Sequence, residues 1–150
     1  MTSEAEWVET VRRAAGSAGS IDEAASELAE LIRAGSGRRW VGIYRLAASE
    51  VVNLAWSGPA PPAHPRFPIG RGLTGAAIAA RAAVCSNDVS GDPRYLTNQP
   101  TTGSELIVPI LRDGDVVGTL DVEEAHPNAF AAGDERPFEA IAEALSPLYR

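Results

Sequence analysis

A chain of 150 residues with 45% hydrophobic residues is expected to fold as one globular domain. Its net charge of −7 argues against nucleic acid as a partner, because phosphate contacts require a basic face. All 13 basic residues are arginine and there is one cysteine, which excludes lysine Schiff-base chemistry, an internal disulfide and a cysteine metal cluster.

No apolar stretch approaches the roughly 20 residues that a membrane helix requires, so no membrane partner is expected. The first residues lack the basic and apolar regions of a signal peptide. We therefore expect a cytoplasmic protein. Neither a metal ion nor another cofactor is predicted.

The N-terminal part of the chain is predicted to be helical. Residues 4–15 form a short amphipathic helix with Trp7 on its apolar side. We treat residues 1–19 as an N-terminal helical segment that precedes a single domain over residues 20–150.

A second helix follows, with signals at both of its ends. Ser20 and Glu23 have the spacing of a capping box, which satisfies backbone N–H groups at a helix start. Apolar residues then repeat at helical spacing, and Gly35 or Gly37 can end the helix.

The first predicted hairpin is followed by a proline-rich loop. Residues 39–47 and 50–57 read as two strands that are close enough in sequence to pair, with Trp40 and Tyr44 on one face of the first. Five prolines within residues 58–68 predict a loop throughout that segment.

The middle of the chain combines short elements with one long loop. The turn at residues 70–72 leads into a helix over 73–81, whose N-terminus is a weak candidate for anion binding. Residues 84–86 read as a short strand. The polar segment 87–103 is long for a compact domain, and loops of that length are typical of lids and binding loops.

Acidic residues follow in a second hairpin. Asp113 and Gly114 separate two apolar runs and predict a type I′ turn. Because side chains alternate along a strand, Asp121 and Glu123 point the same way, and Glu105 is expected near them on the partner strand. We interpret this face as a pocket; the alternatives are a solvated outer face or a magnesium or calcium site.

The last element is a helix that Asp134 can cap. Its apolar stripe and that of the first helix can cover one sheet face and still meet a second copy, so a homodimer is expected. The predicted fold is α+β, an antiparallel sheet with terminal helices on one face and loops plus a short helix over a ligand pocket on the other. The stripe of the last helix consists of Phe138, Ile141, Leu145 and Leu148.

Five segments match a known pattern in order and spacing: residues 39–44, 67–75, 87–89, 104–110 and 118–123. Together they resemble a GAF domain over about residues 20–148, and within that family they resemble free methionine-(R)-sulfoxide reductase. The resemblance implies a GAF-like sheet with a small-molecule pocket. The ligand-binding residues that it implies are Trp40, Tyr44, Glu105, Asp121 and Glu123.

The reductase's catalytic cysteines have no counterpart in this chain. Residues 96–103, where its nucleophile lies, contain no cysteine; Thr74 stands at a second cysteine position, and the third falls near His64. Sulfoxide reduction requires an attacking thiolate and a resolving thiol. The single Cys85, which we expect to be a small buried residue, cannot serve as both.

The resulting hypothesis is a non-catalytic sensory or regulatory domain that binds an amino acid or another ammonium-bearing ligand. Trp40 and Tyr44 beside three carboxyl groups suit a cation, since aromatic faces attract ammonium groups. One alternative is a divergent reductase that uses Cys85, and another is a dimerisation module without a ligand. The downstream protein partner of a sensor is not identified by these residues.

Overall fold

The computed structural model describes residues 3–150 and confirms the predicted α+β fold. A six-stranded antiparallel sheet runs through the molecule in the order β3-β2-β1-β6-β5-β4. Long central strands therefore stand between short edge strands. The strands are β1 (Trp40–Ala47), β2 (Glu50–Ser57), β3 (Arg66–Pro68), β4 (Val84–Ser86), β5 (Ser104–Arg112) and β6 (Asp115–Glu124).

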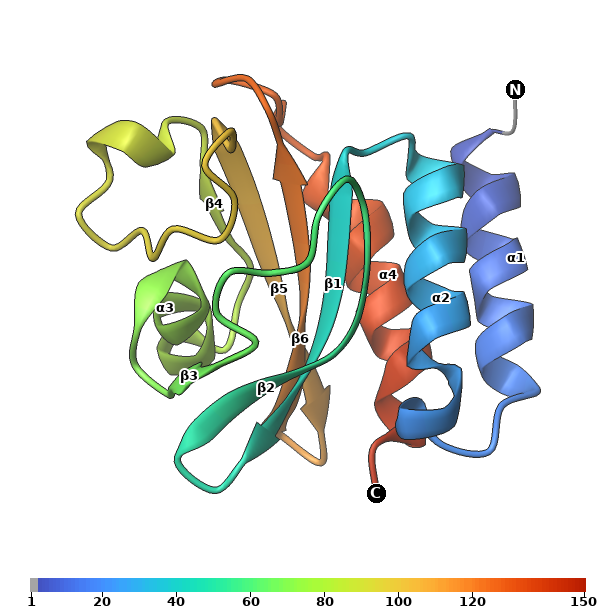
Figure 1. The fold of residues 1–150 in the computed structure, drawn as a ribbon. Helices are drawn as coiled ribbons and strands as arrows, with labels where there is room; N and C mark the ends of the chain where they lie inside the picture. The colour runs from blue at the N-terminus through green and yellow to red at the C-terminus, as the bar shows by residue number, and fades with distance from the viewer. Residues whose placement is uncertain (1–2) are drawn as a thin grey trace.

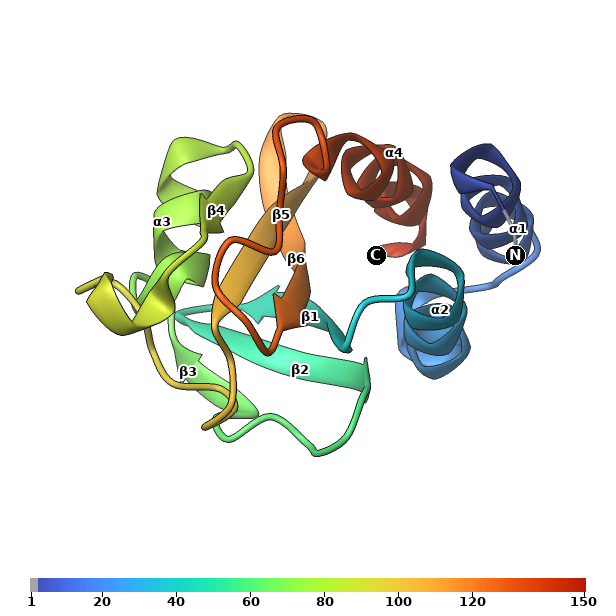
Figure 2. The ribbon, with the colours of Figure 1, turned by 90° about the horizontal axis from the view of Figure 1, so that it is seen from above.

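Helices cover the sheet on both sides. α2 (Ile21–Ser36) and α4 (Glu135–Leu145) pack on one face, while α3 (Gly72–Ala80) and the long loops lie over the other (Figure 1). α1 (Glu4–Gly16) lies outside α2 and α4 as a further layer (Figure 2). Two 3-10 turns, η1 (Val89–Gly91) and η2 (Ser146–Leu148), complete the elements. No helix within residues 3–150 combines the length and the apolar character needed to cross a bilayer.

Local signals explain where several elements begin and turn. The Ser20 side chain accepts a hydrogen bond from the backbone N–H of Glu23, and Gly37 ends α2 in the left-handed conformation at φ 72°. Asp113 and Gly114 both have positive φ, at 53° and 83°, as the predicted hairpin turn requires.

The apolar stripes of the terminal helices are buried within one chain. The rings of Trp7 in α1 and Phe138 in α4 are 5.8 Å apart, and Val11 and Ile141 are fully buried. The surface that we expected a second copy to share is therefore largely used inside the monomer. Homodimerisation stays a prediction.

The proline-rich segment 58–68 is not a loop throughout, and that prediction is wrong at its end. Residues Arg66–Pro68 form β3, in which Phe67 pairs with Val51 of β2. Proline is tolerated there because an edge strand leaves half of its backbone groups outside the ladder.

Cys85 is exposed, so the expectation of a buried thiol is wrong as well. It lies in β4, an edge strand of only three residues. Cys85 pairs with Leu106 of β5, which packs in the core beneath α2 and α4. Residues that pair across a sheet share a face, so the thiol lies on the helix-covered side.

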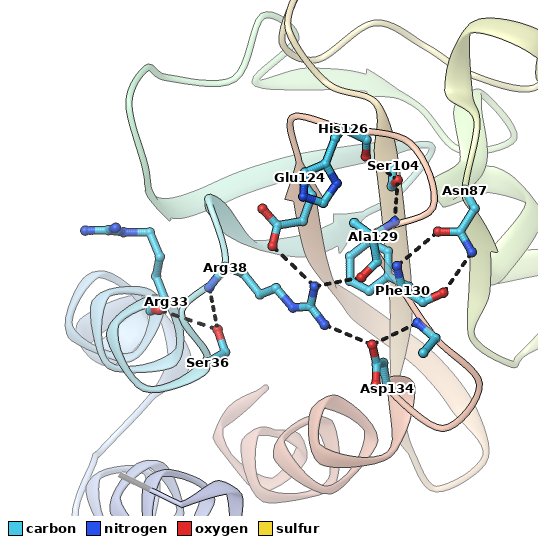
Figure 3. A network of polar contacts seen from close by, with 11 residues as sticks. Arg33, Ser36, Arg38, Asn87, Ser104, Glu124, His126, Ala129, Phe130 and Asp134 are labelled. Carbon is cyan, nitrogen blue, oxygen red and sulfur yellow. Dashed lines mark hydrogen bonds and ion pairs between the residues drawn. The ribbon is translucent and has the colours of Figure 1, made fainter. Parts of the chain in front are cut away.

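Asp134 stands at the start of α4 but does not cap it through its side chain, contrary to the prediction. Its carboxylate instead accepts hydrogen bonds from Arg38 (3.2 Å) and from the N–H of Ala131 (Figure 3). Arg38 also donates to Glu124 and to the Ala129 carbonyl. These contacts fix the segment between β6 and α4, which lies next to both ends of the long loop 87–103.

Candidate functional site

The register of the central strands brings the predicted acidic residues together. Glu123 of β6 pairs with Trp40 of β1 on one side and with Glu105 of β5 on the other, and Asp121 pairs with Gly42. This face is the one opposite α2 and α4. The predicted site residues on it, each at most 5% exposed, are Trp40, Tyr44, Glu105, Asp121 and Glu123.

A small cavity of about 20 Å³, enough for about one water molecule, lies on this face with the lid closed. Three of the predicted residues line it, namely Tyr44, Glu105 and Asp121. Sequence reasoning did not assign the other lining residues to the site, because they come from loops and from α3. They are His64, Phe67, Gly72, Thr74, Leu96 and Asn98.

Trp40 supports the wall of the site rather than lining the cavity. Its indole N–H donates a hydrogen bond to the Ala60 carbonyl at 2.9 Å, which holds the proline-rich loop against the sheet. A side chain at Gly42 would collide with Cη2 and Cζ3 of the Trp40 indole, so the glycine leaves room for that ring.

Asp121 is the least satisfied polar group of the site. One carboxylate oxygen accepts a hydrogen bond from the Thr74 hydroxyl at 3.4 Å, while Oδ1 is buried without a hydrogen-bond partner among residues 3–150. The Thr119 hydroxyl beside it on β6 also makes no hydrogen bond of good geometry within that range, yet it is close enough to Asp121 to lower the pKa of that carboxyl group. Burial raises the pKa of Asp121 to about 8, because the ionised form is costly away from water.

The other two carboxyl groups experience the same environment. Burial raises the pKa of Glu105 well above its ordinary value, and the charges of Glu123 and Asp121 raise it further. Burial also raises the pKa of Glu123. The pKa of Tyr44 is raised by burial and then by the charges of the three acids, so the cavity becomes negative and suits a cation when these acids are ionised.

The segment 87–103 forms a lid over this face. Its Asn98 side chain donates to one oxygen of Glu123, and the Thr102 hydroxyl donates to the other at 2.5 Å. Gln99 donates to the Pro61 carbonyl at 2.6 Å, which ties the lid to the proline-rich loop. The two long loops therefore close together above the acids.

Metal binding has little support in this geometry. Within residues 3–150, no three His, Cys, Asp or Glu side chains are placed to hold a metal ion. Both carboxylate oxygens of Glu123 already accept hydrogen bonds from the lid, so Glu105 and Asp121 are the carboxyl groups that face the cavity. Two carboxylates are few for calcium, which takes six to eight oxygen ligands.

Comparisons with known proteins agree with this architecture. A family model described as "GAF domain" matches residues 18–147. The chain is 34% identical to protein YtsP of Bacillus subtilis over 108 residues, which cover 71% of this chain and 65% of YtsP. It is 27% identical to the free methionine-R-sulfoxide reductase of Escherichia coli over 97 residues, 65% of this chain and 58% of that enzyme. These alignments thus cover less than two thirds of either relative.

A solved structure extends the likeness to almost the whole fold. The free methionine-R-sulfoxide reductase of Neisseria meningitidis, in complex with its substrate, superposes with a TM-score of 0.89 at 25% identity. The match covers 97% of this chain and 87% of that one.

Proposed function

Because the chain belongs to the GAF domain family, we propose that it is a small-molecule-binding module and not an enzyme, with a pocket for an ammonium-bearing ligand such as an amino acid. The observation that carries the proposal is Asp121, which lines the cavity and whose Oδ1 is buried without a hydrogen-bond partner among residues 3–150. A buried carboxylate oxygen without a hydrogen bond is destabilising unless a ligand supplies one.

An ammonium group meets the requirements of this cavity. It carries a positive charge beside Glu105 and Asp121, and it offers three N–H donors for charge-assisted hydrogen bonds. The Tyr44 ring in the wall adds a cation–π attraction of about 0.5–2 kcal/mol. Phe67 and Leu96 give the cavity an apolar side for the rest of the ligand, which requires more room than the closed cavity of about 20 Å³ and therefore an opening of the lid.

The position of Cys85 argues against the alternative function as a reductase. Cys85 lies on the helix-covered face of the sheet, whereas the cavity lies on the other face. A thiolate must contact the sulfur that it attacks. The similarity to free methionine-R-sulfoxide reductases therefore supports an amino-acid-like ligand more than it supports their chemistry.

As a sensory module, the protein would report the state of the pocket to a second protein through its lid or terminal helices. Homodimerisation belongs to this proposal and is not required by it. Light scattering at micromolar concentrations decides whether the 15.7 kDa chain associates.

A thermal-shift screen of amino acids and simple amines tests the binding proposal. A compound at about 100 times its dissociation constant should stabilise the folded state by about 2.7 kcal/mol. Asp121→Asn should abolish the shift, while Asp115→Asn at the exposed hairpin end should retain it. Affinity should fall as the pH is lowered from 8, because the pKa of Asp121 is about 8 and its protonated form attracts the ammonium group less. Equal shifts in the two variants would contradict the proposal.

Turnover of free methionine-(R)-sulfoxide is expected to stay at background with either a small thiol or a thioredoxin system as reductant. The reason is that the cavity-lining residues include no cysteine. Product should be quantified for the parent and for Cys85→Ser, which should not differ. Turnover by the parent that disappears in Cys85→Ser would contradict this prediction and support a reductase that uses Cys85.

A further inference from the structure

The lid is fixed at both of its ends by hydrogen bonds. At one end, the Asn87 side chain donates to the Phe130 carbonyl (2.9 Å) and accepts from the Phe130 N–H (3.1 Å), as Figure 3 shows. At the other end, the Gly103 N–H donates to the Glu124 carbonyl at 2.8 Å. A hydrogen bond of 3.1 Å from Val89 N–H to the Gly103 carbonyl closes the loop at its base. Opening can therefore occur within the loop while its two ends stay in place.

Glu123 is the point at which the middle of the lid meets the sheet. Its side chain is 1% exposed, and each of its oxygens accepts a hydrogen bond from a lid residue, one from Asn98 and one from Thr102. Glu123 does not line the cavity, whereas Glu105, directly opposite it on β5, does. The two glutamates thus have different surroundings despite their adjacent positions.

We infer that Glu123 holds the lid and not the ligand: its carboxylate is a latch, fastened by Asn98 and Thr102, that must be released before a small molecule can enter the pocket. The ligand's cation is then bound by Glu105 and Asp121. The identity of the ligand as a cation rests on the proposed function. The contacts of Glu123 with the lid are present in the empty protein and do not depend on it.

Chemistry explains why a carboxylate suits this task. An ionised acceptor makes hydrogen bonds about twice as strong as a neutral one, and burial removes competing water. Glu105 works against the latch, because two carboxylates in directly paired positions repel each other. A cation bound beside Glu105 relieves that repulsion, so the lid closes more firmly over an occupied pocket.

The rate of trypsin cleavage within the lid measures how often the lid opens, and the measurement requires no ligand. The chain has no lysine, and Arg94 is the single arginine within 87–103, so a cut in the lid yields the fragment 1–94. In the closed lid, Arg94 is held to Asp92 by hydrogen bonds of 2.9 and 2.7 Å. Arg45 lies within β1 and is cut only when the sheet unfolds, so it reports global unfolding in the same digest.

Asn98→Asp replaces the side-chain amide that donates to Glu123 with a carboxylate of the same shape, which repels Glu123. Cleavage after Arg94 at pH 8 should rise about tenfold or more, the equivalent of one lost charge-assisted hydrogen bond, with cleavage after Arg45 unchanged. Adding Glu123→Gln should restore cleavage to within about threefold of the parent, since the amide can donate to the new carboxylate. Asn128→Asp, an equal charge change in an exposed loop, should have no effect.

The rescue is the decisive arm of the experiment. The latch is overturned if Asn98→Asp leaves cleavage after Arg94 unchanged, if Arg94 and Arg45 become sensitive together, or if Glu123→Gln fails to restore protection. A screen that finds no ligand would count against the proposed function and would leave these results intact, because the digest contains protein and trypsin alone.

Discussion

Asp121→Asn should raise the melting temperature of the empty protein at pH 8 by about 5 °C or more and change it little at pH 5. The cause is the buried carboxyl group, which is 3% exposed and whose pKa burial raises to about 8. Asparagine has nearly the same shape and never carries the charge.

The direction of the effect follows from proton linkage. An aspartate in the unfolded chain has a pKa of about 3.9. Between about pH 4 and pH 8 the folded protein therefore keeps a proton on Asp121 that the unfolded chain has lost. The stability contributed by this proton is complete below about pH 4, declines as the pH rises, and is lost above about pH 8. Each unit of pKa difference corresponds to about 1.4 kcal/mol, so the effect amounts to several kcal/mol.

Calorimetry at pH 5 and pH 8 on the parent, Asp121→Asn and Asp115→Asn measures the effect. Glu105 and Glu123, whose pKa values burial also raises, should leave some loss of stability between these pH values in Asp121→Asn. Working above pH 5 avoids Asp92, whose pKa the Arg94 guanidinium holds well below its usual range. The prediction is wrong if Asp121→Asn melts at a lower temperature than the parent at pH 8. The ionised Asp121 carboxylate would then stabilise the folded state, which the described contacts do not explain.

The alternation of side chains along a strand is why the acidic face could be predicted from sequence. Asp121 and Glu123 are two residues apart on β6, and their burial follows from the apolar character of the whole hairpin. Trp40 and Tyr44 lie on the same face of β1 for the same reason. Local periodicity also located nearly every helix and strand, because most of these elements are amphipathic.

The position of Glu105 depends on a feature that periodicity does not reveal. A two-residue turn without a bulge would pair Glu105 with Val122 and turn it toward the helices. In the structure the register shifts by one residue between Ile110 and Leu111, so that Glu105 meets Glu123 on the pocket face. The alternation of side chains along one strand does not reveal where such a bulge falls.

Long-range contacts account for what sequence reasoning missed. Thr74 and Asn98 lie in α3 and the lid, and each contacts an acid that lies 47 or 25 residues further along the chain. Polar residues in such segments look like ordinary surface positions until the fold brings them over the sheet. The exposure of Cys85 was missed because an apolar neighbour such as Val84 suggests burial, whereas β4 is a short strand at the edge of the sheet.

Gly118→Ala should be strongly destabilising, by about 3 kcal/mol or more in urea unfolding, because overpacking here involves backbone atoms. A Cβ at Gly118 would collide with the backbone carbonyl oxygen of Tyr44 and lie 2.6 Å from the Tyr149 hydroxyl. Gly118 pairs with Arg45 of β1 and with Ile110 of β5, so neither neighbouring strand can move away freely. Gly16→Ala, where nothing lies within 4 Å of the added methyl group, is the matched control and should be neutral or slightly stabilising.

The close packing around Gly118 includes a contact between Tyr44, which lines the pocket, and Tyr149 near the end of the chain. The Tyr149 hydroxyl donates a buried hydrogen bond of 2.9 Å to the same Tyr44 carbonyl, while the Tyr44 ring lines the cavity on the opposite face of β1. A shift of Tyr44 on ligand binding would thus be felt by the C-terminal segment. Tyr149→Phe, which removes only the hydroxyl, should cost about 1–3 kcal/mol and should rescue Gly118→Ala only slightly, because the clash with the Tyr44 carbonyl remains. Full rescue in the double variant would mean that the Tyr149 hydroxyl, and not the Tyr44 backbone, requires a glycine at this position.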